Sequence, residues 1–129
     1  MATILPFKGI RPTKEEAATI AALPYDVYNR QEAYEKVKEQ PGSFLAIDRP
    51  ETQFAPDVDM YSDAVYNKAA EMLNKWIEEG RFIQDSKEFY YVYELTMDGR
   101  SQTGIVACAS IDDYQNSVIK KHENTRAEK

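Results

Sequence analysis

The hydrophobic pattern of this 129-residue chain changes period once, and that change constrains the fold most. Between residues 65 and 77, apolar side chains recur at i, i+4, i+7, i+8, i+11 and i+12, the stripe of a buried helix face: Val65, Ala69, Met72, Leu73, Trp76 and Ile77. Gly80 stands where such a helix needs a left-handed residue after its end. From residue 89 to 95 the period is two, as in a β-strand. The chain therefore combines helices with strands.

The strand at 89–95 is followed by the strongest hairpin signal in the sequence. Asp98-Gly99 favours a two-residue turn, because both positions of that turn need a positive φ. We expect the return strand to run from about Arg100 to Ala109. A turn at residues 112–114 should follow.

Helix signals also occur in the amino-terminal half. Thr13 and Glu16 have the spacing of a capping box, which predicts a helix that continues to Ala22 and stops before Pro24. Asn29 and Glu32 have the same spacing and predict a second helix over 30–39. Residues 24–27 are expected to form a turn or loop between the two.

Two further strands are expected in this half of the chain. Residues 3–10 are apolar but interrupted by Pro6, which is typical of an edge strand or an extended arm. Residues 43–47 form a short apolar run after Pro41-Gly42 and predict a strand. Because these elements lack a regular βαβ rhythm, the predicted class is α+β, with a mixed small sheet, a C-terminal β-hairpin and about three packed helices. Residues 1–129 are expected to form a single domain.

Charge and hydropathy exclude several classes of function. The net charge is −6 and the pI about 4.8, so the chain as a whole repels phosphate backbones and anionic membrane surfaces. Nucleic acid is therefore not an expected partner, although a few local cations suffice for a small phosphorylated ligand. The sequence shows neither a secretory leader nor an apolar run of the ~20 residues that span a bilayer. We expect a cytoplasmic protein.

The inventory of reactive side chains excludes further chemistry. With one cysteine and one histidine, the chain cannot form a zinc site from those ligands alone. The segment from His122 resembles the start of a zincin helix, but Arg126 stands where the second histidine is required. The five glycines are scattered and form no phosphate-binding loop. Cys108 lies in an apolar run and is expected to be buried and inert.

The segment 120–126 is the strongest candidate for chemistry. It contains two lysines, a histidine, a carboxylate, an amide, a hydroxyl and an arginine within seven positions. Arginine can form two hydrogen bonds with a phosphate, lysine adds a point charge, and histidine can transfer protons near neutral pH. The alternative is a solvated helix start in which Asn124 or Thr125 is the cap.

Three other places carry weaker signals. Residues 48–51 leave the predicted strand at 43–47 and could present Arg49 to a ligand, or form an ordinary exit turn with an ion pair. Residues 24–27 could present a phenol and a carboxylate, which turn chemistry explains equally well. The aromatic cluster at 89–91 is better explained by cross-strand packing than by stacking on bases.

These motifs occur together in an order that resembles the amino-terminal part of the DUF1015 family of uncharacterised bacterial and archaeal proteins. The resemblance covers essentially the whole chain and rests on five segments: 6–12 (PFKGIRP), 24–27 (PYDV), 43–51 (SFL with RPE), 102–105 (QTGI) and 120–125 (KKHE with T). Family members are longer, which implies that this chain is part of a larger protein. The family is also similar to the ParB-like group, which includes nucleotide-binding proteins. The run of glutamate and arginines typical of ParB is absent from this sequence.

The leading hypothesis is an enzyme, or the ligand-binding part of one, that acts on a phosphorylated metabolite or nucleotide. Arg49, Lys121, Thr125 and Arg126 would bind the anionic oxygens. His122 would act as general acid or base, and Glu123 would orient it or hold Mg²⁺ with a nucleotide. No protein-only metal site, other cofactor or oligomeric state follows from the sequence.

Two alternatives stay open. A non-catalytic regulatory or scaffold module could bind a partner through the aromatic hairpin, which would then expose apolar side chains from 89 to 95. A ParB-like nucleotide- or DNA-binding protein would need a basic face around Lys120, Lys121 and Arg126.

Overall fold

The computed structural model describes residues 1–120, which separate into two compact units. Residues 10–83 form the first, here called the helical unit. Residues 1–9 and 84–120 form the second, here called the hairpin unit. The chain therefore passes between the units twice, after Gly9 and after Ile83.

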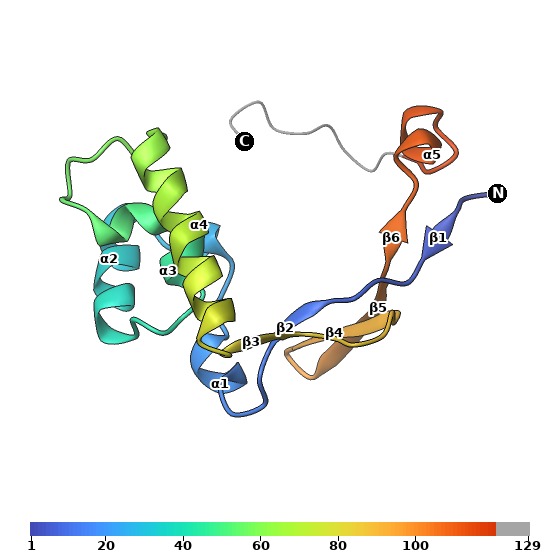
Figure 1. The fold of residues 1–129 in the computed structure, drawn as a ribbon, viewed down its shortest axis with the longest axis horizontal. Coiled ribbons are helices and arrows are strands. Elements are labelled where there is room, and N and C mark those ends of the chain that lie inside the picture. Colours follow the sequence, from blue (N-terminus) through green and yellow to red (C-terminus); the bar gives the residue numbers. More distant parts are fainter. Residues whose placement is uncertain (121–129) are drawn as a thin grey trace. The chain divides into compact units, whose positions relative to one another are not determined.

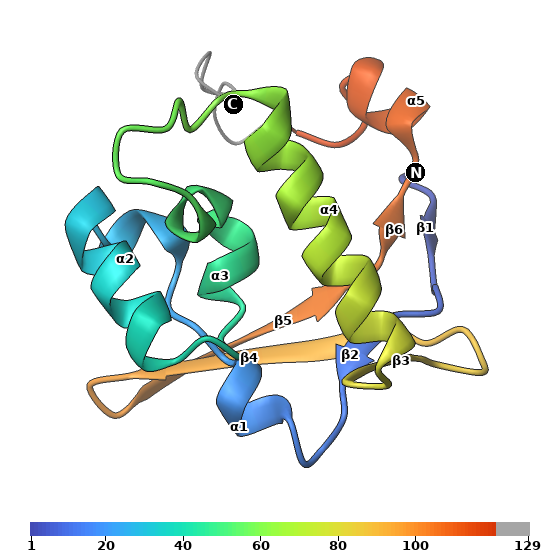
Figure 2. The same ribbon diagram turned by 60° about the vertical axis from the view of Figure 1, so that its left-hand side comes forward.

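Among the described residues, the helical unit contains four α-helices, two short 3₁₀ helices and one two-stranded sheet, whose last residue, Gln84, already belongs to the hairpin unit. In chain order they are β2 (Ile10–Pro12), α1 (Ala17–Ile20), η1 (Tyr25–Val27), α2 (Arg30–Glu39), α3 (Leu45–Asp48), η2 (Pro50–Gln53), α4 (Asp63–Glu78) and β3 (Phe82–Gln84). Strands β2 and β3 pair with each other. The longest helix, α4, packs on α3 and η2, while α2 also contacts both of these elements (Figure 2).

The core of the helical unit is built on α4. The Trp76 ring stacks on Phe82 with centroids 6.1 Å apart, and Ile20 and Ile47 complete this buried cluster. A second cluster joins α2 to α3 through Val37 and Leu45. The apolar stripe predicted for α4 is thus the stripe that packs inward. Gly80 has φ 73°, as expected after the end of that helix.

The prediction of a strand at 43–47 is wrong. Residues 45–48 form the short helix α3, and Ser43 and Phe44 make its first turn. All of Leu45, Ala46 and Ile47 are buried. A short apolar run that is buried on every side has no period to separate a strand from a helix. Here the backbone bonds locally, because the N–H groups of Ile47 and Asp48 both donate to the Phe44 carbonyl.

The two predicted capping boxes have different outcomes. At Asn29 the box is complete, with the Asn29 side chain accepting from Glu32 N–H and the Glu32 side chain accepting from Asn29 N–H, and α2 has the predicted bounds. At Thr13 only the Glu16 N–H to Thr13 Oγ1 bond forms, at 3.3 Å. The Glu16 carboxylate instead binds the Arg81 guanidinium at 2.8 Å. Helix α1 therefore begins only at Ala17 and is shorter than predicted.

The hairpin unit contains the predicted β-hairpin. Its elements are β1 (Ile4–Leu5), β4 (Tyr91–Met97), β5 (Arg100–Val106), β6 (Cys108–Ala109) and α5 (Ile111–Gln115) (Figure 1). Strand β4 pairs antiparallel with β5 from Tyr91↔Val106 to Met97↔Arg100, and β1 pairs antiparallel with β6. Asp98 and Gly99 have φ values of 51° and 76°, so the turn chemistry was predicted correctly. The predicted turn at 112–114 lies within α5 instead.

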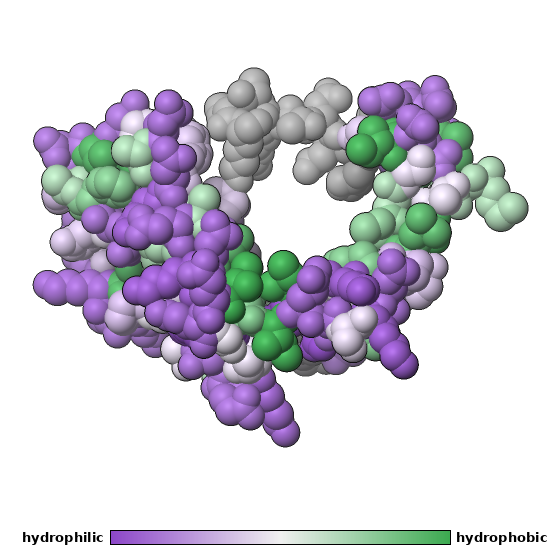
Figure 3. All heavy atoms as spheres, viewed as in Figure 1, coloured by the Kyte–Doolittle hydropathy of each residue, from purple (hydrophilic) through white to green (hydrophobic). Residues whose placement is uncertain are grey.

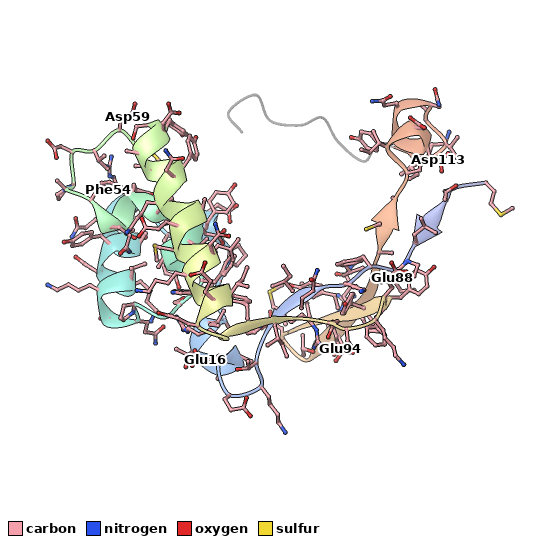
Figure 4. All side chains as sticks on the ribbon, in the orientation of Figure 1. Glu16, Phe54, Asp59, Glu88, Glu94 and Asp113 are labelled. Atoms are coloured by element: carbon pink, nitrogen blue, oxygen red, sulfur yellow. The ribbon has the colours of Figure 1, made fainter. Side chains whose placement is uncertain are left out.

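A tyrosine hydroxyl ties the amino-terminal segment to the hairpin. Tyr91 Oη accepts from Gly9 N–H at 2.6 Å and donates to Asp85 Oδ2, also at 2.6 Å. The Phe7 ring lies 5.0 Å from the Tyr91 ring, and Phe7 forms a bridge with Phe89. At the far end, Asp113 of α5 accepts a bond from Thr3 N–H at 2.7 Å (Figure 4). These bonds explain why residues 3–10 are an extended arm.

Apolar side chains of the hairpin unit reach its surface. Val92 and Ile105, directly opposite each other on one face, are 75% and 77% exposed, and Tyr93, Leu95 and Met97 are exposed on the other. Cys108 is exposed as well, so its predicted burial is wrong. Figure 3 shows further hydrophobic residues at the surface near β1, β6 and α5. An apolar sequence run predicted the strands correctly, but not their burial.

The α+β class is confirmed, with the strands arranged as three two-stranded sheets within the described residues. In the same part of the chain, no helix combines the length and apolarity that crossing a bilayer requires. The single domain expected from the sequence stays a prediction.

Candidate functional site

Five of the six predicted site residues lie outside the described part of the chain: Lys121, His122, Glu123, Thr125 and Arg126. Their roles, and the expected meeting with Arg49, stay predictions. Lys120, the last described residue, is exposed. The site can therefore be built from Arg49 and its surroundings in the helical unit.

Arg49 follows α3 and is buried, with 9% of its side chain exposed. Its Nε donates to Glu51 Oε1 at 2.6 Å, and its Nη1 donates to the backbone carbonyls of Tyr25 and Tyr28 at 3.2 and 2.8 Å. A buried guanidinium needs such compensation, since an unpaired buried charge is strongly destabilising. Arg49 thus joins the 24–27 and 49–51 sequence motifs.

The local sequence places Glu51 beside Arg49. Pro50 begins η2, where its fixed φ suits the first helical position and its missing N–H costs no bond. Thr52 closes the turn by donating its hydroxyl to the Arg49 carbonyl at 2.7 Å. Both Glu51 and Thr52 are buried. The Arg-Pro-Glu motif is therefore a compact turn built around an internal ion pair.

A pocket of about 230 Å³ lies between α2 and the η2 turn. It is lined by Arg30, Gln31, Tyr34, Glu51, Thr52 and Pro56. The wall from α2 bears residues at i, i+1 and i+4, which lie on adjoining parts of one helix face. The pocket thus combines one guanidinium and one carboxylate with apolar lining from the tyrosine ring and the proline.

Arg30 is the cation of this pocket and is half-buried. Its Nη2 donates to the Val58 carbonyl at 2.6 Å, which fixes the side chain against the loop before α4. Within residues 1–120, no carboxylate forms an ion pair with it, in contrast to the pairs made by Arg49 and Arg81. The guanidinium has five donors, so the Val58 bond leaves others available for an anionic group.

A second hollow, between η1 and α2, is wide and shallow, with a volume of about 370 Å³. Its lining is dominated by the carboxylates of Glu32, Glu35 and Glu39, with Lys36 paired to the last of these at 3.8 Å. Glu32 is also part of the capping box. This surface suits a solvated helix face better than a site for an anion.

Asp48 precedes Arg49 at the end of α3. Partial burial raises the pKa of its carboxyl group above the ordinary value, through loss of solvation. Among residues 1–120 no group of three or more His, Cys, Asp or Glu side chains could hold a metal ion.

The comparison with protein families then identifies the chain. The profile of the family described as "Protein of unknown function (DUF1015)" matches residues 4–129. The chain belongs to the DUF1015 family. No curated protein and no solved structure matches it. Residues 24–27 and 49–51, two of the segments on which the resemblance to this family rests, are joined by the hydrogen bonds of Arg49.

Sequence reasoning did not identify Arg30, Tyr34 or Glu51 as pocket residues. Arg30 and Tyr34 occupy α2 positions that are four residues apart, a spacing that marks a shared helix face. That spacing is visible in the sequence. The opposite wall of the pocket is not, because the sequence predicts a strand at 43–47 followed by an exit turn at 48–51. The exit turn with an ion pair predicted at 48–51 does contain such a pair, but Glu51, its carboxylate, is buried.

Proposed function

We propose that this DUF1015 protein binds a small phosphorylated metabolite and that the pocket between α2 and η2 is part of its binding site. The observation that carries the proposal is Arg30, a half-buried guanidinium in a pocket wall with no carboxylate partner in residues 1–120. Arginine binds phosphate oxygens through paired N–H groups, and such charge-assisted bonds are about twice as strong as neutral ones.

The wider proposal keeps the segment 121–126 as the catalytic part of the enzyme. Lys121, Thr125 and Arg126 would bind further anionic oxygens, while His122 would transfer a proton and Glu123 would orient it or hold Mg²⁺. Arg49 would contribute by holding Glu51 in the pocket wall, because its donors already bind Glu51 and two backbone carbonyls. A cytoplasmic location belongs to the same proposal.

The experiment is a thermal-shift screen of phosphorylated metabolites and nucleotides, with and without Mg²⁺. A ligand present at one hundred times its Kd stabilises the folded state by about 2.7 kcal/mol, which is a measurable change in Tm. We expect Arg30→Gln to lose the ligand-induced shift. Lys38→Gln is the matched control, since it removes an exposed cation from the same helix and should leave the shift intact.

The His122→Ala variant separates the two parts of the proposal. If the predicted segment completes the site, this variant weakens binding or abolishes turnover. A binding shift that survives His122→Ala but not Arg30→Gln would confine the ligand to the α2–η2 pocket. The absence of any shift with the wild-type protein would contradict the proposed function.

A second candidate function is a protein-interaction module, favoured by the exposed apolar side chains of the hairpin. Contiguous apolar surface of this kind marks interaction sites in soluble proteins. Two-stranded hairpins are also marginally stable alone, so a partner that covers β4 and β5 would stabilise them. A second copy of the chain is the partner that can be tested directly.

Sedimentation velocity over a range of protein concentrations tests this candidate. Self-association that Ile105→Lys abolishes and Thr103→Lys preserves would support an apolar interface on the face shared by Val92 and Ile105. The control introduces the same charge on the same strand and face, opposite Glu94. A monomer at every concentration would count against self-association through the hairpin.

A further inference from the structure

We infer that the ligand of the α2–η2 pocket is a small monophosphate that carries a free hydroxyl group, with Arg30 binding the phosphate and Glu51 accepting a hydrogen bond from the hydroxyl. The inference rests on the proposed function and specifies the chemistry of its ligand. It depends on the contacts of Glu51 and on the size of the pocket.

Glu51 is a carboxylate held in place inside the protein. Only 3% of its side chain is exposed, and its Oε1 accepts from Arg49 Nε at 2.6 Å. Within residues 1–120, its Oε2 accepts no hydrogen bond. Among the described residues the fully buried polar side-chain atom without a partner is Ser62 Oγ, so Glu51 Oε2 is not fully enclosed and can meet solvent or a ligand. A ligand hydroxyl that donates to Oε2 forms a hydrogen bond to a charged acceptor and gains affinity.

The charge of Glu51 decides which part of the ligand it meets. An ionised carboxylate accepts hydrogen bonds but cannot donate, and it repels a phosphate. The donor end of the ligand must therefore face Glu51, and the anionic end must face Arg30. Because Arg49 already balances Glu51, the pocket retains one positive charge, which suits a ligand with net negative charge.

The remaining polar groups of the pocket contribute less to this selection. Thr52 uses its hydroxyl hydrogen on the Arg49 carbonyl, and the Gln31 amide donates to Glu35 Oε1 at 2.8 Å. The ring of Tyr34 and the ring of Pro56 offer apolar contacts for a short carbon chain. Recognition then depends on the two charged side chains of the pocket, Arg30 and Glu51.

The volume limits the ligand to a small one. At about 230 Å³ the pocket is smaller than the roughly 300–1,000 Å³ that is usual for sites of drug-sized ligands. A phosphate with a short hydroxylated carbon chain suits a pocket of this size. A nucleotide is larger, so we expect nucleotides to bind this pocket weakly.

Isothermal titration calorimetry with three probes tests the inference on the wild-type protein. The probes are glycerol 3-phosphate, propyl phosphate, which has the same length without hydroxyls, and AMP. Since a hydrogen bond to a charged group has a large effect, glycerol 3-phosphate should bind about tenfold to a hundredfold tighter than propyl phosphate. AMP should bind more weakly than glycerol 3-phosphate.

Glu51→Gln provides the matched variant, because it keeps the shape of the side chain and removes its charge. We expect it to reduce the preference for glycerol 3-phosphate over propyl phosphate to less than about threefold, measured as a ratio of Kd values. Equal affinity of the two probes for the wild-type protein overturns the inference, and so does tighter binding of AMP. If Glu51→Gln does not fold, the wild-type comparison decides alone.

Failure of the inference and failure of the proposed function give different results. When both alkyl phosphates bind equally and Arg30→Gln abolishes both, the phosphate site stands and the role of Glu51 is wrong. When no phosphate binds, or Arg30→Gln has no effect on binding, the proposed function itself is wrong.

Discussion

The helical unit and the hairpin unit contain apolar side chains in similar variety but differ in where those side chains lie. Every buried hydrophobic residue of the described chain belongs to residues 10–83. The described part of the hairpin unit buries only Gly9 and exposes residues such as Val92, Leu95 and Ile105. Secondary structure in the hairpin therefore follows from local pattern and turn chemistry, whereas the helical unit is held by a core.

The two units also differ in how buried their main polar contacts are. In the helical unit, Arg49 and Glu51 are buried together and join several elements. In the hairpin unit, the hydroxyl of Tyr91 links the amino-terminal arm to the strands at a half-buried position. Substitutions in the first unit should consequently have larger effects on stability than substitutions in the second.

The largest effect is expected for Glu51→Ala. It leaves the Arg49 guanidinium buried without its carboxylate, which typically lowers the free energy of unfolding by about 3–5 kcal/mol. Urea unfolding followed by the fluorescence of Trp76, the only tryptophan, measures this change. Lys68→Ala is the control, because it breaks the largely exposed pair with Glu71 and should cost less than about 1 kcal/mol. Equal effects of the two variants would contradict the structural role of the buried pair.

Two leucine truncations test the comparison between the units directly. Leu45→Ala removes a side chain that is 1% exposed and should lower the free energy of unfolding by about 2–5 kcal/mol. Leu95→Ala removes a side chain that is 55% exposed and should change it by about 0.5 kcal/mol or less. Thermal and urea unfolding measure both. A large fall in the free energy of unfolding for Leu95→Ala would show that this face of the hairpin is covered in solution. The two units would then no longer differ in whether their apolar side chains are buried.

Gly9→Ala probes the tie between the arm and the hairpin. A Cβ at Gly9 would lie 2.7 Å from Tyr91 Oη, so overpacking should destabilise the hairpin unit by about 1–3 kcal/mol. Amide hydrogen exchange over residues 84–109 measures the loss of protection. Gly104→Ala is the control, because the nearest atom to its Cβ would be the Tyr93 carbonyl oxygen at 4.0 Å.

The same variant shows whether the units unfold together. If Gly9→Ala also lowers the urea midpoint reported by Trp76, the two units behave as the single domain expected from the sequence. If that midpoint is unchanged while the hairpin amides lose protection from exchange, the two units unfold independently of each other.

The smallest effect is expected at Asp48. Burial raises the pKa of this carboxyl in the folded state, so the folded state binds its proton more tightly than the unfolded state does. The free energy of unfolding therefore falls as pH rises from the ordinary aspartate pKa through the raised one. Asp48→Asn should be slightly more stable than the wild type at pH 7 and equal to it below about pH 3. Urea titrations at several pH values measure the difference, and no gain at pH 7 would contradict the assignment.

Strong local signals predicted much of the fold. The stripe of α4, the cap at Asn29 and the Asp98-Gly99 turn each specify structure through nearby residues alone, and all three are confirmed. The errors lie where distant residues decide the outcome. Arg81, 65 residues away from Glu16, takes the carboxylate that would have completed the first capping box. Residues 43–47 form a helix because they are buried on all sides and lack a readable period.

The candidate site was predictable only in part, for the same reason. Arg49 was singled out from its motif, yet its partners Tyr25 and Tyr28 lie 24 and 21 residues earlier, and no local pattern connects them. The pocket needs α2 and η2 to face each other, and that pairing depends on the core formed by Val37 and Leu45. The polar segment 121–126 was recognised by composition, which indicates chemistry but not geometry.

The double passage of the chain between the units has a consequence for synthesis on the ribosome. Ile4 pairs with Ala109, so the first strand emerges long before its partner exists. At translation rates of about 5–20 residues per second, that wait lasts roughly 5–20 s. Residues 10–83 are complete in the meantime and can fold first. The nascent chain thus carries an unpaired apolar strand during elongation, a natural target for the chaperones that meet new polypeptides.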